Sequence, residues 1–197
     1  TTNGLFDLDL TTSRTSTGGM TINANDVDIS GAGTTAINTL NINSEQNVNL
    51  DHHFTLSSAS STDTIAAKGN VTTKALTKTG GILNITADSD LSGAGEYIHT
   101  AGEVKATTLT VKGNDIDLQG GTITGLSTVN FLPVTDANIG LGSSDNTGEF
   151  DLSDAELDTI TSPRVIIGGD SALSITASDI SHTTSSDYFK LEAKQGD

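Results

Sequence analysis

The sequence contains no cysteine, which excludes a disulfide scaffold, a thiolate zinc site and a cysteine nucleophile. Tryptophan is also absent, and aromatic residues make up only 4% of the chain. A core built on large aromatic side chains is therefore excluded, and a sugar site with stacked aromatic rings is disfavoured. No run of about 18 apolar residues occurs, so the chain is not expected to span a membrane as a helix.

Basic residues are scarce, with Lys and Arg totalling 9 against 25 Asp and Glu, and the formal net charge is −16. Nucleic acid is excluded as a partner, because its binding depends on cationic contacts with phosphates. The charge chiefly predicts solubility, and divalent-cation binding is the alternative. The chain begins with Thr1 and shows no signal peptide, so we expect processing or excision from a longer protein.

What the chain does have is a repeated pattern. Residues 20–33 (MTINANDVDISGAG) and 109–121 (LTVKGNDIDLQGG) share it, and partial copies begin at residues 40, 83 and 173. Apolar residues alternate with polar ones within a copy, which is typical of a strand with one buried face. Gly113-Asn114 interrupts the alternation and predicts a corner between two short strands.

The recurrence predicts an all-β protein, a right-handed parallel β-helix (β-solenoid) with coils of about 21 residues. Residues 1–197 form one such domain, with about 1–10 and 186–197 as possible capping or subunit-contact segments. Val111 should lie inside and Asp117 outside. An antiparallel sandwich would explain the alternation but not the recurrence. The best helix candidate is 152–160.

Residues 134–180 resemble the repeats of filamentous-haemagglutinin-type exoproteins. The shared residues are LSDAELDTIT (152–161), Ile167-Gly168 and Ile175-Thr176, and residues 80–91 and 120–131 are similar to a lesser degree. The resemblance implies a right-handed parallel β-helix, exported across a bacterial outer membrane by two-partner secretion and used as a surface fibre or adhesin. The family's Asn-rich export motifs and terminal toxin domain are missing, so the chain would be a shaft segment or a small relative.

Acidic pairs could bind Ca²⁺ through oxygen ligands, because carboxylates two apart on a strand share one face. The weak candidate ligands are Asp115, Asp117, Asp145, Glu149 and Asp151. The loop 143–151 is the most plausible single calcium site, although it lacks the full EF-hand pattern. A solvated outer face is the alternative. No other cofactor is expected.

The histidines give little support for a metal site. His52 and His53 are adjacent, so on a strand they point to opposite faces, and we expect them in a solvated loop after Leu50. His99 and His182 are isolated.

No convergent reactive group is visible, so we expect no enzyme activity. Arg14 and Arg164 lie far apart, although sugar-cleaving enzymes also use parallel β-helices. Ice binding would need a regular Thr-x-Thr on every coil, which is missing.

The expected function is structural: a segment or subunit of a secreted bacterial surface adhesin or filament. Its expected partners are other copies or flanking segments, and a host or neighbouring-cell surface. The alternatives are a self-assembling fibre subunit joined end to end by strand pairing, or a calcium- or carbohydrate-binding surface module.

Overall fold

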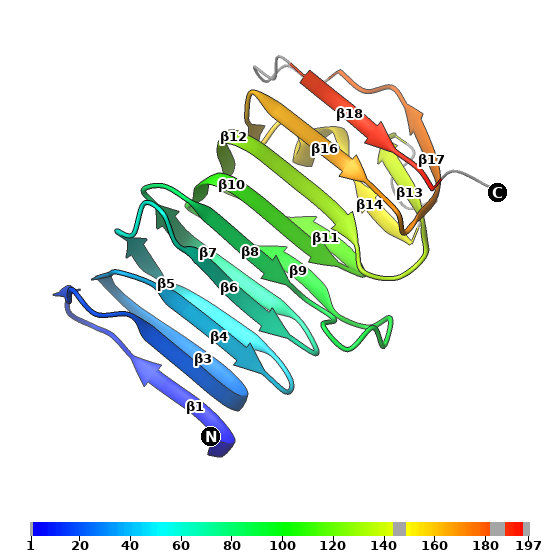
Figure 1. Cartoon of the computed structure of the whole chain (residues 1–197). Coiled ribbons are helices and arrows are strands. Elements are labelled where there is room, and N and C mark those ends of the chain that lie inside the picture. Colours follow the sequence, from blue (N-terminus) through cyan, green and yellow to red (C-terminus); the bar gives the residue numbers. More distant parts are fainter. Residues whose placement is uncertain (1, 144–148, 182–187, 195–197) are drawn as a thin grey trace.

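The computed structural model describes residues 2–143, 149–181 and 188–194. Most of them lie in parallel strands, which confirms the all-β prediction. The helix candidate at 152–160 contains one helical turn, α1 (Asp154–Leu157). Figure 1 shows the strands side by side, from β1 at one end of the molecule to β17 and β18 at the other.

Seven strands of the larger sheet are joined in a closed ring. Their hydrogen-bonded order is β7, β5, β3, β4, β6, β8, β10 and back to β7. The ring strands are β3 (Met20–Ile37), β4 (Leu40–Ser44), β5 (Val48–Leu56), β6 (Thr62–Ala67), β7 (Val71–Lys78), β8 (Ile82–Thr86) and β10 (Glu103–Gly113).

Further strands pair in parallel on the outside of this ring. They are β1 (Thr2–Asp9), β2 (Arg14–Thr15), β9 (Glu96–His99), β11 (Asp115–Leu118), β12 (Thr122–Pro133), β15 (Ile160–Thr161), β16 (Arg164–Gly168) and β18 (Tyr188–Glu192). A second sheet has the order β14-β13-β17, with β13 (Ala137–Gly142), β14 (Phe150–Leu152) and β17 (Ala172–Ser178).

The prediction of an open right-handed β-helix with coils of about 21 residues is therefore wrong, because the pairings form a closed parallel barrel with extra strands outside. Long strands cause the closure. The first residues of β3 pair with β4, and the rest of β3 pairs mainly with β5. Similarly, β10 pairs with β7 at Val104 and Lys105 and with β8 from Thr108 onwards.

Two rows of inward-facing side chains cross eight strands of the larger sheet. We call them the inner rows. The first consists of Ile22, Ile42, Ile65, Ile85, Val111, Phe131, Ile167 and Leu191. The second consists of Met20, Leu40, Asp63, Leu83, Leu109, Val129, Val165 and Phe189. Burying these apolar faces against one another is the main favourable contribution to folding.

The repeat copies account for part of these rows. Copies beginning at 20, 40, 83 and 109 place their first strands in β3, β4, β8 and β10, where they share the inner rows. Val111 is fully buried, as predicted. The copy beginning at 173 differs, because it forms β17 in the second sheet. The predicted corner at Gly113-Asn114 is confirmed between β10 and β11.

Candidate functional site

The structure brings two of the predicted calcium ligands together, Asp115 on β11 and Asp151 on β14. Asp115 Oδ1 accepts the Asp151 backbone N–H at 2.9 Å and the Ile116 N–H at 2.8 Å. Burial raises the pKa of Asp115. The two N–H donors work against this shift, while the charges of Asp151 and Glu96 raise the pKa further. Asp115 therefore serves as a hydrogen-bond acceptor that ties β11 to β14.

The other predicted ligands are dispersed. Asp117 accepts a hydrogen bond from Gln119 Nε2 at 2.7 Å on the outer face, and Glu149 Oε2 accepts the Asn138 N–H at 3.3 Å. Asp145 lies outside the described residues. Within the described part of the chain, no group of three or more His, Cys, Asp or Glu side chains could hold a metal ion. Calcium binding stays a prediction, which calorimetric titration with Ca²⁺ would test.

The placement of His52 in a solvated loop is wrong. His52 lies within β5 and is almost completely buried, while His53 is partly exposed. His52 Nδ1 lies 3.0 Å from the Gly31 carbonyl oxygen and Nε2 lies 2.9 Å from Thr35 Oγ1. Because a carbonyl only accepts, Nδ1 carries the proton and Nε2 accepts from the Thr35 hydroxyl. His52 therefore makes structural hydrogen bonds inside the molecule.

His99 belongs to a buried polar cluster. Thr73 Oγ1 lies 2.8 Å from the Tyr97 hydroxyl and 3.3 Å from His99 Nδ1. His99 Nε2 has no partner within hydrogen-bonding geometry. Burial lowers the pKa of His99, and the nearby backbone of Gly102 and Thr73 reverses only part of that shift. Burial also raises the pKa of Tyr97. His182 lies outside the described residues.

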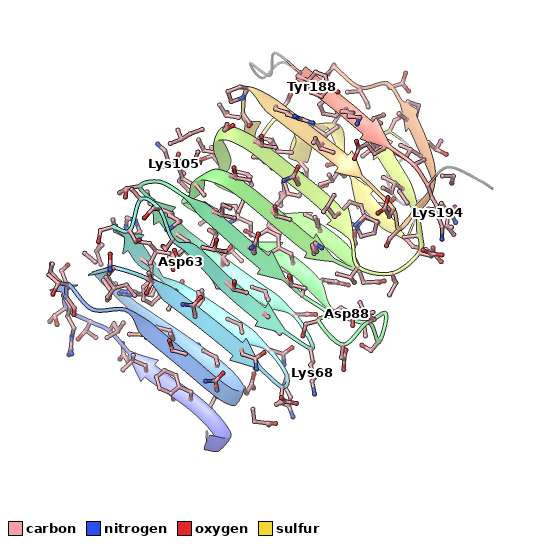
Figure 2. The ribbon with its side chains drawn as sticks, in the orientation of Figure 1. Asp63, Lys68, Asp88, Lys105, Tyr188 and Lys194 are labelled. Atoms are coloured by element: carbon pink, nitrogen blue, oxygen red, sulfur yellow. The ribbon has the colours of Figure 1, made fainter. Side chains whose placement is uncertain are left out.

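A buried ion pair was not predicted. Lys78 Nζ lies 2.5 Å from Asp63 Oδ2, and both side chains are fully buried. Lys78 Nζ also donates to the Ser58 carbonyl at 2.7 Å and to Ser61 Oγ at 2.9 Å, and Asp63 Oδ1 accepts the Leu40 N–H at 2.8 Å. Figure 2 labels Asp63 among the strands of the barrel. The alternation of buried and exposed positions could have indicated this ion pair, because Asp63 and Lys78 both occupy inward-facing positions of their strands.

A second buried carboxylate, Asp88, organises the loop between β8 and β9. It accepts hydrogen bonds from Ser92 N, Ser92 Oγ and Gly93 N at 2.7, 2.7 and 2.8 Å. Burial alone would raise the pKa of Asp88, but these donors lower it overall. In the copy that begins at residue 83, this loop stands where the copy that begins at residue 109 has β11. None of these buried polar groups forms a site that is open to a ligand.

The last described strands of the two sheets lie at the two ends of the molecule. At the N-terminal end, β1 and β2 pair with β3 and with no other described strand. At the opposite end, within the described residues, β18 pairs with β16 and β17 pairs with β13, and the Lys194 N–H donates to the Ala172 carbonyl of β17 at 2.7 Å. Tyr188 and Lys194 mark this C-terminal end in Figure 2. An open edge presents N–H and C=O groups that can pair with another strand.

Apolar side chains lie along these edges. Leu5 of β1 is 58% exposed, Leu173 of β17 is 49% exposed and Leu191 of β18 is 39% exposed. A hollow beside Leu191 is lined by residues of the same end, among them Gly169, Lys190 and Lys194. The segments 1–10 and 186–197 therefore contain edge strands. Whether they cap the molecule or contact a subunit stays a prediction.

Comparison with protein-family models, with curated proteins and with solved structures finds no match. The resemblance to filamentous-haemagglutinin-type exoproteins therefore rests on the repeat residues alone. In the part of the chain that the structure describes, no helix is long and apolar enough to cross a membrane.

Proposed function

We propose that this chain is a structural protein, a segment or subunit of an extracellular filament, and that it acts without catalysis. One observation carries the proposal: the inner rows run through the larger sheet from β3 to β18, so that parallel strands form both described ends of this sheet. Such edges favour continuation of the sheet onto another strand. The partner is another copy or a flanking segment of the same polypeptide.

The buried polar groups support a structural role. Asp63, Lys78, Tyr97 and His99 are all completely buried. Groups that act on a substrate must be reachable from solvent, whereas these side chains are buried in the interior of the molecule. Their hydrogen bonds join neighbouring strands, as the Tyr97 hydroxyl does by bonding Thr73 of β7. These buried hydrogen bonds between strands make the stack of strands stiff.

The location of the filament comes from the repeat resemblance, which favours the surface of a bacterial cell. Two measurements on the source cells test the proposal together. Antibodies against this chain should label intact cells, and the native polypeptide should run on a denaturing gel either at hundreds of kilodaltons or near the mass of this chain. The first mass indicates one stretch of a long shaft, and the second a complete subunit. Antigen found only inside lysed cells would contradict the proposal.

A further inference from the structure

Lys78 and Asp63 place an amine nitrogen against a carboxyl group away from solvent. Nζ lies 2.5 Å from Oδ2, and neither side chain is exposed. Within the described residues, both side chains of every other ion pair are at least 33% exposed. An amine and a carboxylic acid can condense to an amide, so this enclosed contact is one that can become covalent.

The surroundings of Lys78 hold its amine in this position. Nζ donates to the Ser58 carbonyl at 2.7 Å and to Ser61 Oγ at 2.9 Å. Gly81 lies close beside the lysine, because a Cβ at that glycine would be 3.1 Å from Lys78 Cε. Groups held in reacting geometry can behave as if they were present at about 10⁵–10⁸ M, which favours reaction between them.

We propose that Lys78 and Asp63 become joined by an amide bond between their side chains once the chain has folded. The bond between Lys78 Nζ and Asp63 Cγ forms, the bond between Asp63 Cγ and Oδ2 breaks, and one molecule of water leaves. Nothing is oxidised or reduced, so the condensation needs no further reactant. The product joins β6 to β7 covalently.

The hydrogen bonds of Lys78 prepare its nitrogen for attack. Its N–H bonds are directed at Asp63 Oδ2, the Ser58 carbonyl and Ser61 Oγ. Passing the first proton to Oδ2 gives a neutral amine and a neutral acid, which burial favours because charges are costly away from water. The other two N–H bonds stay with Ser58 and Ser61, so the free electron pair of Nζ points at the Asp63 carboxyl group.

Two further groups serve the later steps. Attack on Cγ moves negative charge onto Asp63 Oδ1, which already accepts the Leu40 N–H at 2.8 Å. A donor aimed at that oxygen stabilises the tetrahedral intermediate. Ser61 Oγ lies 2.9 Å from Nζ and 3.4 Å from Oδ2, so its hydroxyl can take a proton from the nitrogen and give one to the departing oxygen. Oδ2 then leaves as water.

Mass spectrometry of the full-length folded protein tests the bond. We expect the intact mass to fall short of the sequence mass by one water. Trypsin cleaves after a free lysine but not after an amidated one, so digestion of the denatured protein should give residues 15–68 joined to residues 75–105. Cleavage after Lys74 is the internal control, because Lys74 Nζ lies 2.9 Å from Asp51 Oδ1 in an exposed ion pair that should stay unlinked.

Variants identify the reacting groups. Lys78→Met and Asp63→Ala should each have the full mass of their own sequences. Ser61→Ala keeps both reacting groups and should slow bond formation by about a hundredfold or more, since the proton relay is lost. The rate is measured as the intact mass over time after dilution from denaturant. Ser57→Ala is the matched control and should react at the wild-type rate, because Ser57 Oγ donates to the Ile37 carbonyl instead.

The wild-type mass decides the inference even if a variant fails to fold. Full sequence mass after prolonged incubation of the folded protein, with normal cleavage after Lys78, would overturn the bond. Loss of one water together with cleavage after Lys78 would overturn it too, because the dehydration would then lie elsewhere. Equal rates for Ser61→Ala and Ser57→Ala would remove the relay assigned to Ser61. None of these results depends on where the native polypeptide is located, so this inference and the proposed function can fail separately.

Discussion

Asp63 interrupts the second inner row, where its neighbours Leu40 and Leu83 are apolar. Burying an isolated carboxylate is very costly, so its position depends on Lys78 and on the Leu40 N–H. Replacing a whole buried ion pair with apolar groups is often neutral, but removing one partner leaves an uncompensated charge. We therefore expect removal of one partner to lower the free energy of unfolding more than replacement of both partners does.

Lys78→Met should lower the free energy of unfolding by about 3–5 kcal/mol, because Asp63 then remains buried without its cation. The double variant Asp63→Asn/Lys78→Met should lose much less, since the amide oxygen can still accept the Leu40 N–H. Chemical denaturation of the wild type and both variants measures the difference. An equally large loss in the double variant would show that the contacts of Lys78 with Ser58 and Ser61 dominate.

His99 gives the molecule a pH dependence. Its folded-state pKa lies below the unfolded value of about 6.5, so the unfolded chain binds the proton more tightly. The neutral, buried His99 therefore contributes its full share of stability above about pH 7. This share is lost as the pH falls through 6.5, because protons then bind preferentially to the unfolded chain. Thermal melts from pH 8 to pH 5 should show the fall, and His99→Leu should show a smaller one. An unchanged pH profile in His99→Leu would assign the effect to other groups.

Val111 tests the assignment of inside and outside. Val111→Asp should cost at least about 3 kcal/mol, because the new carboxylate is buried among apolar neighbours without a cation. Asp117→Asn is the control on the outer face, and it should change stability little. Comparable melting temperatures for Val111→Asp and the wild type would contradict the assignment.

At the scale of elements, one side chain ties α1 to the larger sheet. Glu156 Oε2 accepts the Ser153 N–H and hydroxyl, and Ser153 Oγ accepts the Glu156 N–H, forming a capping box. Glu156 Oε1 accepts the Leu118 N–H of β11 at 2.8 Å. One carboxylate thus caps the helix and satisfies a backbone donor 38 residues away.

Glu156→Ala should destabilise the protein by about 1–2 kcal/mol, because the cap and the bond to β11 are both lost. Glu156→Gln keeps one acceptor and should lose less. Denaturant titration compares the two variants. If both lose the same amount, the charge rather than the hydrogen bonds is what matters.

Single strands are the level at which the sequence is most informative. Alternation in LTVKGNDIDL (109–118) correctly predicts two strands and the corner at Gly113-Asn114. The loop at 87–95 breaks the same pattern because Asp88 and Leu91 adopt positive φ. The contact of Asp115 with Asp151 joins residues far apart in sequence, so no local pattern predicts it.

Closure into a barrel was not predictable for a related reason. It depends on a short pairing of Val104 with Leu76 and Lys105 with Thr77. Periodicity shows which face of a strand is buried, but it does not specify which of several neighbours the strand pairs with along its length. Because β3 is 18 residues long, different parts of it can pair with different neighbouring strands.

At the scale of the whole molecule, the net charge of −16 opposes association of copies. Repulsion between copies extends about 30 Å at 0.01 M salt and about 8 Å at 0.15 M. We therefore expect the end-to-end association to strengthen as salt is raised over this range, which sedimentation velocity would measure. Association that weakens with salt would indicate that ion pairs dominate the contact.

The parallel pairing of every strand in the larger sheet makes the two ends of the molecule chemically different. A filament of copies in one orientation consequently has polarity, with β1 displayed at one tip and β18 at the other. Growth at the two tips need not proceed at equal rates.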